Sequence, residues 1–80
     1  MATLRLFAAA REAAGRNRDE MVDARTVADV LAEAQRRYGA TFTALLPTCR
    51  VWVNGEQADA ATPVGPADEV AVLPPVSGGA

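Results

Sequence analysis

The 80-residue chain is long enough for one domain with a small core, and half of it is hydrophobic largely because alanine is abundant. All eight basic residues are arginine, histidine is absent and the net charge is −2, which argues against a nucleic-acid binder and against histidine-based catalysis or zinc binding. One cysteine excludes an internal disulfide, and no segment is apolar over the length of a membrane span, so we expect a cytoplasmic protein that binds no membrane.

The first part of the chain predicts two strands with a short connection. Residues 3–7 (TLRLF) alternate between polar and apolar side chains, as a strand does. Residues 8–15 contain good helix formers and end in a glycine, so we expect a single helical turn or a wide loop. Residues 18–24 carry a weaker strand pattern and could pair back on the first strand.

The clearest predicted element is an amphipathic helix over residues 26–38. Thr26 and Asp29 have the spacing of a capping box, and apolar side chains recur at helical spacing until Gly39. A short helical or turn segment follows, and Pro47 is expected to end it.

The rest of the chain predicts a hairpin and a last strand. Residues 49–59 (CRVWVNGEQAD) carry the strongest hairpin signal, because their Asn-Gly pair favours a type I′ turn. Residues 59–68 contain two prolines and predict an irregular connection. Residues 69–73 alternate again, and Pro74 and Pro75 prevent further ladder pairing.

These elements predict an α+β fold with one main helix packed across one face of a mixed sheet of four or five strands. We expect residues 1–75 to form the domain and residues 76–80 to form a flexible tail. If the helix covers the alternating Leu and Val side chains, then Phe7, Trp52 and Leu73 face the other way. Large apolar side chains on an uncovered face predict a partner-binding surface. The alternative is that they lie at the rim of the core or that the faces are reversed.

The final residues, VSGGA, have no periodicity, no charge and no partner strand, so we expect them to extend from the body. From Pro74 to Gly79 an extended chain reaches about 20 Å. Gly78 and Gly79 have no side chain, so this tail could enter a channel too narrow for other residues. A frayed terminus is the alternative interpretation.

Three segments together resemble the MoaD/ThiS sulfur-carrier family: LFAAAREAAG near the start, the central VWVNGE and DEVAVLPPVSGG near the end. The resemblance spans residues 4–79. It implies a ubiquitin-like β-grasp fold and a carrier with no active site of its own. The Pro-Pro pair followed by Val76 and Ser77 favours the molybdopterin branch, in which the carrier is the small subunit of molybdopterin synthase.

The resemblance also implies the chemistry. The carboxylate of Gly79 would be adenylated with ATP by a ubiquitin-activating-like adenylyltransferase and then converted to a thiocarboxylate. The large synthase subunit would use this sulfur for the dithiolene of molybdopterin, in molybdenum cofactor biosynthesis. The carrier itself would bind no metal and no cofactor, because the activating partner uses the ATP. The resemblance assigns Phe7 and Leu73 to an apolar docking surface and places three residues at the root of the tail: Pro74, Pro75 and Val76. Strand alternation adds Trp52 to this surface.

Three residues depart from simple expectations. Members of the family normally stop at Gly-Gly, so we expect a protease, such as a metalloprotease, to remove Ala80; activation of Ala80 as it stands and an addition to the natural end are alternatives. Ala67 stands where the family often has glycine, which leaves the geometry of that turn open. Cys49 has no neighbouring His, which predicts a small apolar residue and not a sulfur-relay thiol.

Two other functions stay open from the sequence. One is a sulfur carrier for another pathway, such as cysteine, thiamine or a secondary metabolite. The other is a ubiquitin-like interaction module without sulfur chemistry.

Overall fold

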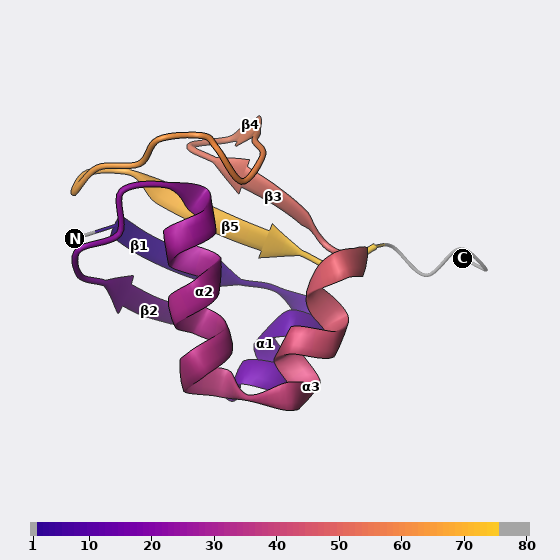
Figure 1. Cartoon of the computed structure of the whole chain (residues 1–80). Coiled ribbons are helices and arrows are strands. Elements are labelled where there is room, and N and C mark those ends of the chain that lie inside the picture. Colours follow the sequence, from indigo (N-terminus) through magenta and orange to yellow (C-terminus); the bar gives the residue numbers. More distant parts are fainter. Residues whose placement is uncertain (1, 76–80) are drawn as a thin grey trace.

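The computed structural model describes residues 2–75, which form a five-stranded sheet with helices packed against it (Figure 1). The strands are β1 (Ala2–Leu6), β2 (Arg18–Met21), β3 (Arg50–Val53), β4 (Glu56–Gln57) and β5 (Glu69–Leu73). The helices are α1 (Ala8–Ala14), α2 (Val27–Tyr38) and α3 (Ala40–Leu45), with a 3₁₀ turn, η1 (Leu46–Thr48), after α3. None of the helices within these residues has the length and apolar character needed to cross a bilayer.

The sheet is mixed, as the sequence predicts. The strand order is β2-β1-β5-β3-β4, with β1 and β5 parallel at the centre and the other neighbours antiparallel. The chain therefore returns to the middle of the sheet with its last strand. The expected α+β fold, with α2 as the main helix across one face, is confirmed.

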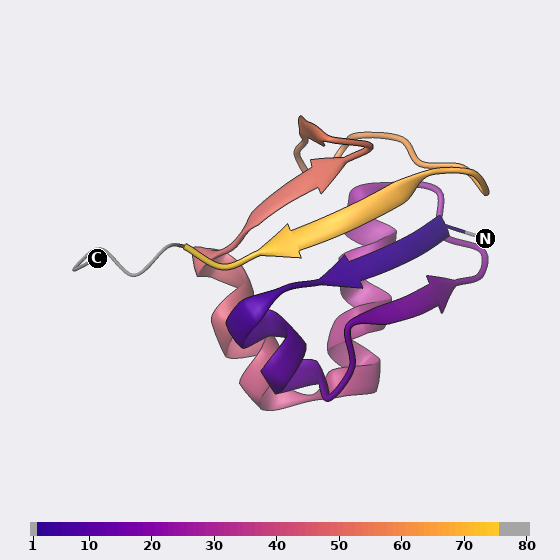
Figure 2. The ribbon, with the colours of Figure 1, turned by 180° about the vertical axis from the view of Figure 1, so that it is seen from behind.

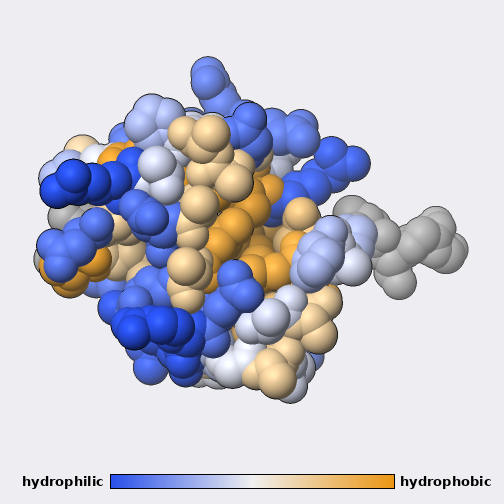
Figure 3. All heavy atoms as spheres, viewed as in Figure 1, coloured by the Kyte–Doolittle hydropathy of each residue, from blue (hydrophilic) through white to orange (hydrophobic). Residues whose placement is uncertain are grey.

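Alternate residues of the central strands form the core under α2. Leu4 is paired with Val70 and Leu6 with Val72, and all four are at most 1% exposed. Phe42 from α3 is also fully buried. On the helix side, apolar side chains remain visible between α2 and β3 (Figure 3), because the apolar residues of β3 are only partly buried. Partly buried apolar residues from α2 and β3 border the core: Leu31, Val51 and Val53.

The N-terminus of α2 begins where the sequence predicts. Thr26 is the N-cap, and its hydroxyl accepts a hydrogen bond from the Asp29 N–H at 3.2 Å. The Asp29 carboxylate in turn accepts the N–H of Arg25 at 3.0 Å. Side chains and backbone thus satisfy donors that a helix start leaves free.

The irregular connection between β4 and β5 completes this cap. The N–H groups of Val27 and Ala28 donate to the carbonyls of Thr62 and Ala60, both at 2.9 Å. These donors have no partner inside the helix, because they belong to its first turn. The connection therefore holds the N-terminus of α2 in place by backbone hydrogen bonds.

Two segments are more helical than the sequence indicates. Residues 8–14 form a complete helix, which ends at Gly15 with a φ of 78° and an N–H bond to Arg11. Residues 40–45 form the helix α3. Pro47 lies inside the following 3₁₀ turn and does not itself end the helix. Both helices form because their apolar sides pack on one another and, at Phe42, on the core.

The hairpin turn and the turn before β5 support each other. Asn54 and Gly55 both have a positive φ, 51° and 86°, which confirms the type I′ turn. The Asn54 amide donates to the Asp68 carboxylate at 2.9 Å, and the other oxygen of this carboxylate accepts the Gly65 N–H at 2.7 Å. The turn at Ala67 therefore needs no glycine, because the Asp68 side chain holds it.

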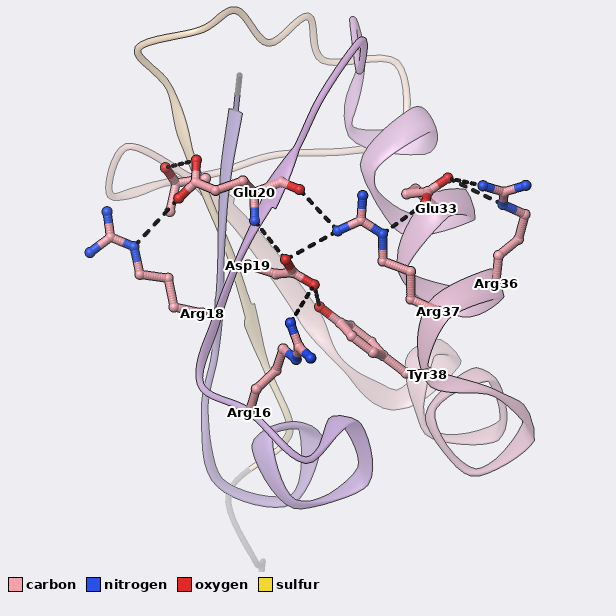
Figure 4. Close-up of polar contacts among 9 residues, drawn as sticks. Arg16, Arg18, Asp19, Glu20, Glu33, Arg36, Arg37 and Tyr38 are labelled. Atoms are coloured by element: carbon pink, nitrogen blue, oxygen red, sulfur yellow. Dashed lines mark hydrogen bonds and ion pairs between the residues drawn. The ribbon is translucent and has the colours of Figure 1, made fainter.

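The largely buried carboxylate of Asp19 connects the edge strand β2 to the C-terminal end of α2 (Figure 4). The Asp19 side chain is 13% exposed, accepts the Tyr38 hydroxyl at 2.6 Å and pairs with Arg37 at 3.1 Å. Arg37 also binds Glu33 at 2.7 Å. Burial raises the pKa of Asp19, but hydrogen bonds from Tyr38, the Glu20 N–H and Arg37 outweigh burial and hold this pKa below its usual value.

We predict that Asp19→Asn lowers the free energy of unfolding at neutral pH by about 1–3 kcal/mol, because the amide keeps the size but loses the charge. The pKa of Asp19 is lower in the folded state, so its contribution is present above about pH 4, the ordinary Asp value, and disappears as the pH falls through the folded value. Urea unfolding at a series of pH values measures this. The difference in the free energy of unfolding between wild type and Asp19→Asn should disappear at acid pH.

The matched control is Glu12→Gln on α1, at an exposed carboxylate, which should change stability little at neutral pH. A gap between wild type and Asp19→Asn that is the same at neutral and acid pH would contradict the assigned role of Asp19.

Candidate functional site

The described chain leaves the body at the C-terminal end of β5. Leu73, the last residue of this strand, is paired with Arg50 of β3. Pro74 is half-buried and Pro75 is exposed, and neither has an N–H to continue the ladder. β5 is bonded on both sides, so the exit point is held by the most central part of the sheet. The predicted tail, residues 76–80, lies outside the described residues, and with it Val76, Gly78, Gly79 and Ala80.

No helix of the described residues covers the face of the sheet opposite α2 (Figure 2). The strand registers place Arg5, Ala71 and Trp52 in one row across β1, β5 and β3. Arg50 and Leu73 form the next row towards the exit. We call this surface the exposed sheet face; its residues are Arg5, Phe7, Arg50, Trp52, Ala71 and Leu73.

Sequence alternation placed Trp52 and Leu73 on this face, and the structure agrees with that placement. Both side chains are half-buried, packed along the sheet and not under α2. The reversed assignment of faces is wrong, because Val70 and Val72 are fully buried on the helix side. A role of these side chains in partner binding stays a prediction.

Phe7 stands at the junction of β1 and α1 and is 38% exposed. Its backbone is extended, with a φ of −126°, and its N–H donates to the Val72 carbonyl at 3.3 Å. The Arg5 guanidinium lies 5.5 Å from the centre of the Phe7 ring and also pairs with Glu69 at 3.2 Å. Such a cation–π contact holds an aromatic ring at the surface without burying it. The next residue, Ala8, has a left-handed φ of 49°, which turns the chain sharply after Phe7.

The exposed sheet face combines apolar surface with guanidinium groups. Arg50 is exposed and forms none of the ion pairs found within residues 2–75. No three His, Cys, Asp or Glu side chains gather into a potential metal site in that range. Among the described residues, the exposed sheet face therefore presents apolar side chains beside guanidinium groups.

Cys49 lies at the same end of the sheet, just before β3. Its side chain is half-buried, and its sulfur contacts the Leu45 carbonyl at 3.5 Å. Burial raises the pKa of the Cys49 thiol, so the thiol is protonated and a poor nucleophile at neutral pH. The structure thus agrees with the interpretation of Cys49 as a small apolar residue.

A shallow hollow between α1 and α3 is the other surface feature of note. Its lining is mostly small and apolar: Ala9, Glu12, Ala13, Thr41, Ala44 and Leu45. None of the residues that the sequence singles out for function lies in it, and we assign it no ligand.

Sequence reasoning did not single out the two arginines on the exposed sheet face. The alternation that places Phe7, Trp52 and Leu73 on this face also places Arg5 and Arg50 there, but it gave the two arginines no function. Their alternation with Leu4, Leu6 and Val51 was the available signal, because a charged residue between buried ones must point away from the core.

Comparison with known families gives one match. The sequence model of the ThiS family matches residues 4–79, which is nearly the whole chain. A search of curated protein sequences gave no significant match.

Several solved structures share the fold. Small archaeal modifier protein 1 (SAMP1) from Haloferax volcanii is 28% identical, with a TM-score of 0.79 and coverage of 95% of this chain and 96% of that one. SAMP1 from Methanosarcina acetivorans is 26% identical, with a TM-score of 0.84 and coverage of 95% and 93%. A complex of subunits 1 and 2 of molybdopterin-converting factor from Helicobacter pylori contains a chain that is 21% identical, with a TM-score of 0.72 and 95% coverage of both chains.

Trp52 is the single tryptophan and reports on the exposed sheet face. We predict that acrylamide quenches its fluorescence in the native protein several-fold more strongly than that of a tryptophan in the core, because no helix lies over it. The reference protein carries Phe42→Trp in a Trp52→Phe background, since Phe42 is fully buried. Equal, weak quenching of the two proteins would show that Trp52 is covered.

Proposed function

The chain belongs to the ThiS family, and we propose that it is a sulfur carrier whose Gly79 carboxylate is adenylated and then converted to a thiocarboxylate. The observation that carries this proposal is the extent of the family match, which runs from β1 to residue 79 and so includes Gly78 and Gly79. The position of β5 at the centre of the sheet supports it, because this strand leads directly to the Gly-Gly pair.

The chemistry requires an activating partner. A carboxylate is a poor electrophile, so one of its oxygens first attacks the α-phosphate of ATP and releases pyrophosphate. A sulfur nucleophile then attacks the carbonyl carbon of the mixed anhydride, and AMP leaves with that oxygen. The carrier contributes no nucleophile of its own, since the Cys49 thiol is half-buried and its pKa is raised. ATP and the sulfur source belong to the partners.

A free carboxylate at Gly79 requires hydrolysis of the Gly79–Ala80 peptide bond. We assign this step to a protease that accepts small residues, such as a metalloprotease. The cut must precede adenylation of Gly79, because until then the free carboxylate belongs to Ala80 and the Gly79 carbonyl is part of an amide, which is a much weaker nucleophile.

Within the family, the molybdopterin branch is the pathway that we favour. Pro74 and Pro75 before the Gly-Gly pair support this choice, as does the shared fold with a subunit of the Helicobacter pylori molybdopterin-converting factor complex. The carrier would then be the small subunit of molybdopterin synthase. It would bind a large subunit and an adenylyltransferase in the cytoplasm, where ATP and the sulfur donors are available.

The exposed sheet face is the surface that we assign to these partners. It lies beside the exit of the chain, so a partner seated on it would be next to the root of the tail at Pro74. Its apolar residues offer area to bury, and Arg5 and Arg50 favour acidic groups around the partner's contact surface.

A second candidate function is a ubiquitin-like protein modifier. The two SAMP1 structures favour it, because they are modifier proteins by name and are 28% and 26% identical. Activation would be the same, and only the acceptor would differ: an amine of another protein in place of a sulfur donor. Sulfur carriers for cysteine, thiamine or a secondary metabolite would form the same thiocarboxylate. They would differ from the molybdopterin branch only in the molecule that accepts the sulfur.

The direct test is incubation of the chain ending at Gly79 with the adenylyltransferase, ATP and a sulfur source, followed by intact mass measurement. We expect the mass to rise by the difference between one sulfur and one oxygen atom, with the change located on Gly79 by fragmentation. The 80-residue chain should stay unchanged until a protease removes Ala80. A thiocarboxylate on a chain that still carries Ala80 would contradict the assigned order.

Docking through the exposed sheet face predicts that Phe7→Ser raises the KM of the adenylyltransferase for the carrier about tenfold, equivalent to ~1.4 kcal/mol of lost binding. Serine is acceptable at this position because Phe7 is the N-cap of α1. The matched control is Val22→Ser, which changes an apolar residue that is 55% exposed at the opposite end of the sheet. Equal KM values for the two variants would rule out docking at Phe7.

A further inference from the structure

Every basic side chain of this protein is a guanidinium. The 80 residues contain eight arginines and no lysine, so no side chain carries an amine. A guanidinium stays protonated and does not attack an activated carboxylate, whereas a fraction of lysine amines is free at neutral to mildly basic pH. Whether the basic residues are arginine or lysine therefore decides whether side chains of the folded domain can react with an activated C-terminus.

The fold explains the guanidinium at two positions. Arg37 uses several donors at once: it binds Glu33 at 2.7 Å, Asp19 at 3.1 Å and the Glu20 carbonyl at 2.9 Å. Arg5 pairs with Glu69 while its planar group lies over the Phe7 ring. A lysine could not reproduce either arrangement, because its ammonium is a single point charge.

The fold does not explain the guanidinium elsewhere. The Arg36 side chain is 76% exposed and contacts one oxygen of Glu33, which an ammonium could do equally well. Arg16 and Arg18 are more than half exposed and pair with one carboxylate each. The remaining three take part in no ion pair within residues 2–75: Arg11, Arg25 and Arg50.

We infer that the body of the carrier is built without side-chain amines so that its own activated C-terminus is not captured by another copy of the protein. This inference rests on the proposed activation of Gly79. The reaction avoided is attack of a lysine nitrogen on the Gly79 carbonyl carbon: a C–N bond forms, the bond from that carbon to the oxygen of AMP breaks, AMP leaves and the nitrogen loses a proton to solvent. The product, an amide, would be permanent and would remove carrier from the cycle.

The absence of lysine would also limit the conjugates that the protein could form if it acted as a protein modifier. A copy attached to the amine of another protein offers no side-chain amine to a second copy. Conjugates would therefore carry single copies, and chains linked through side chains of the carrier would not form.

The test introduces one amine at a time at exposed positions outside the exposed sheet face. Arg36→Lys on α2 and Arg11→Lys on α1 keep the charge, and Arg36→Gln and Arg11→Gln are the matched controls that add no amine. Each protein, ending at Gly79, is incubated with adenylyltransferase and ATP in phosphate buffer without a sulfur source. Hydroxylamine then removes ester and thioester adducts, so that mass spectrometry counts only amide-linked oligomers.

A second arm needs no activating enzyme. The same proteins are prepared as Gly79 thioesters by intein cleavage and incubated under the same conditions, which presents an activated carbonyl by chemistry alone. The α-amino group at residue 1 is common to all of the proteins and supplies the same background in each.

In both arms we expect the lysine variants to accumulate amide-linked oligomers several-fold above wild type and the glutamine controls, with the new bond mapped to residue 36 or 11. Equal oligomer yields from lysine and glutamine variants in the thioester arm would overturn the inference. Release of no pyrophosphate in the enzyme arm, together with capture by lysine in the thioester arm, would contradict the proposed activation and leave the inertness of the body established.

Discussion

The structure depends on the alternation of side chains along β5, the strand that is paired on both sides. Val70 and Val72 enter the core beneath α2, while Ala71 and Leu73 point to the opposite face. Hydrogen bonding to β1 and β3 leaves this strand no freedom to shift, since a slip by one residue would expose both valines. Its end at Leu73 therefore places the exit of the chain at a constant position relative to the exposed sheet face.

The two faces of the sheet differ in what covers them, and our proposal assigns partner binding to the uncovered one. On the helix side, the core and the bonds from Asp19 to Tyr38 and Arg37 hold α2 in place. The other side, which no helix of the described residues covers (Figure 2), carries the half-buried Trp52 and Leu73 beside the exposed Arg50. For the carrier function proposed above, this arrangement would supply a rigid body that orients the C-terminal end and a surface that a partner can bury.

The sequence predicts those parts of the fold that local patterns determine. The sequence shows the alternation in β1, β3 and β5 and the cap at Thr26. The alternation also places Trp52 and Leu73 on the exposed sheet face. The helices α1 and α3 are underestimated because their stability comes from packing on each other, which no short pattern records. The bond between Asp19 and Tyr38 joins residues nineteen positions apart, so it depends on the fold and not on spacing.

The central claim is that partners bind the exposed sheet face, and that this binding brings the C-terminal end of the carrier to their active sites. Nuclear magnetic resonance titration of the labelled carrier with unlabelled adenylyltransferase tests it most directly. We predict that the earliest line broadening appears at the Trp52 indole and at the Ala71 and Leu73 methyl groups, with Arg5 also affected. Broadening that begins instead on the solvent side of α2, around Ala28 and Ala32, would contradict the account.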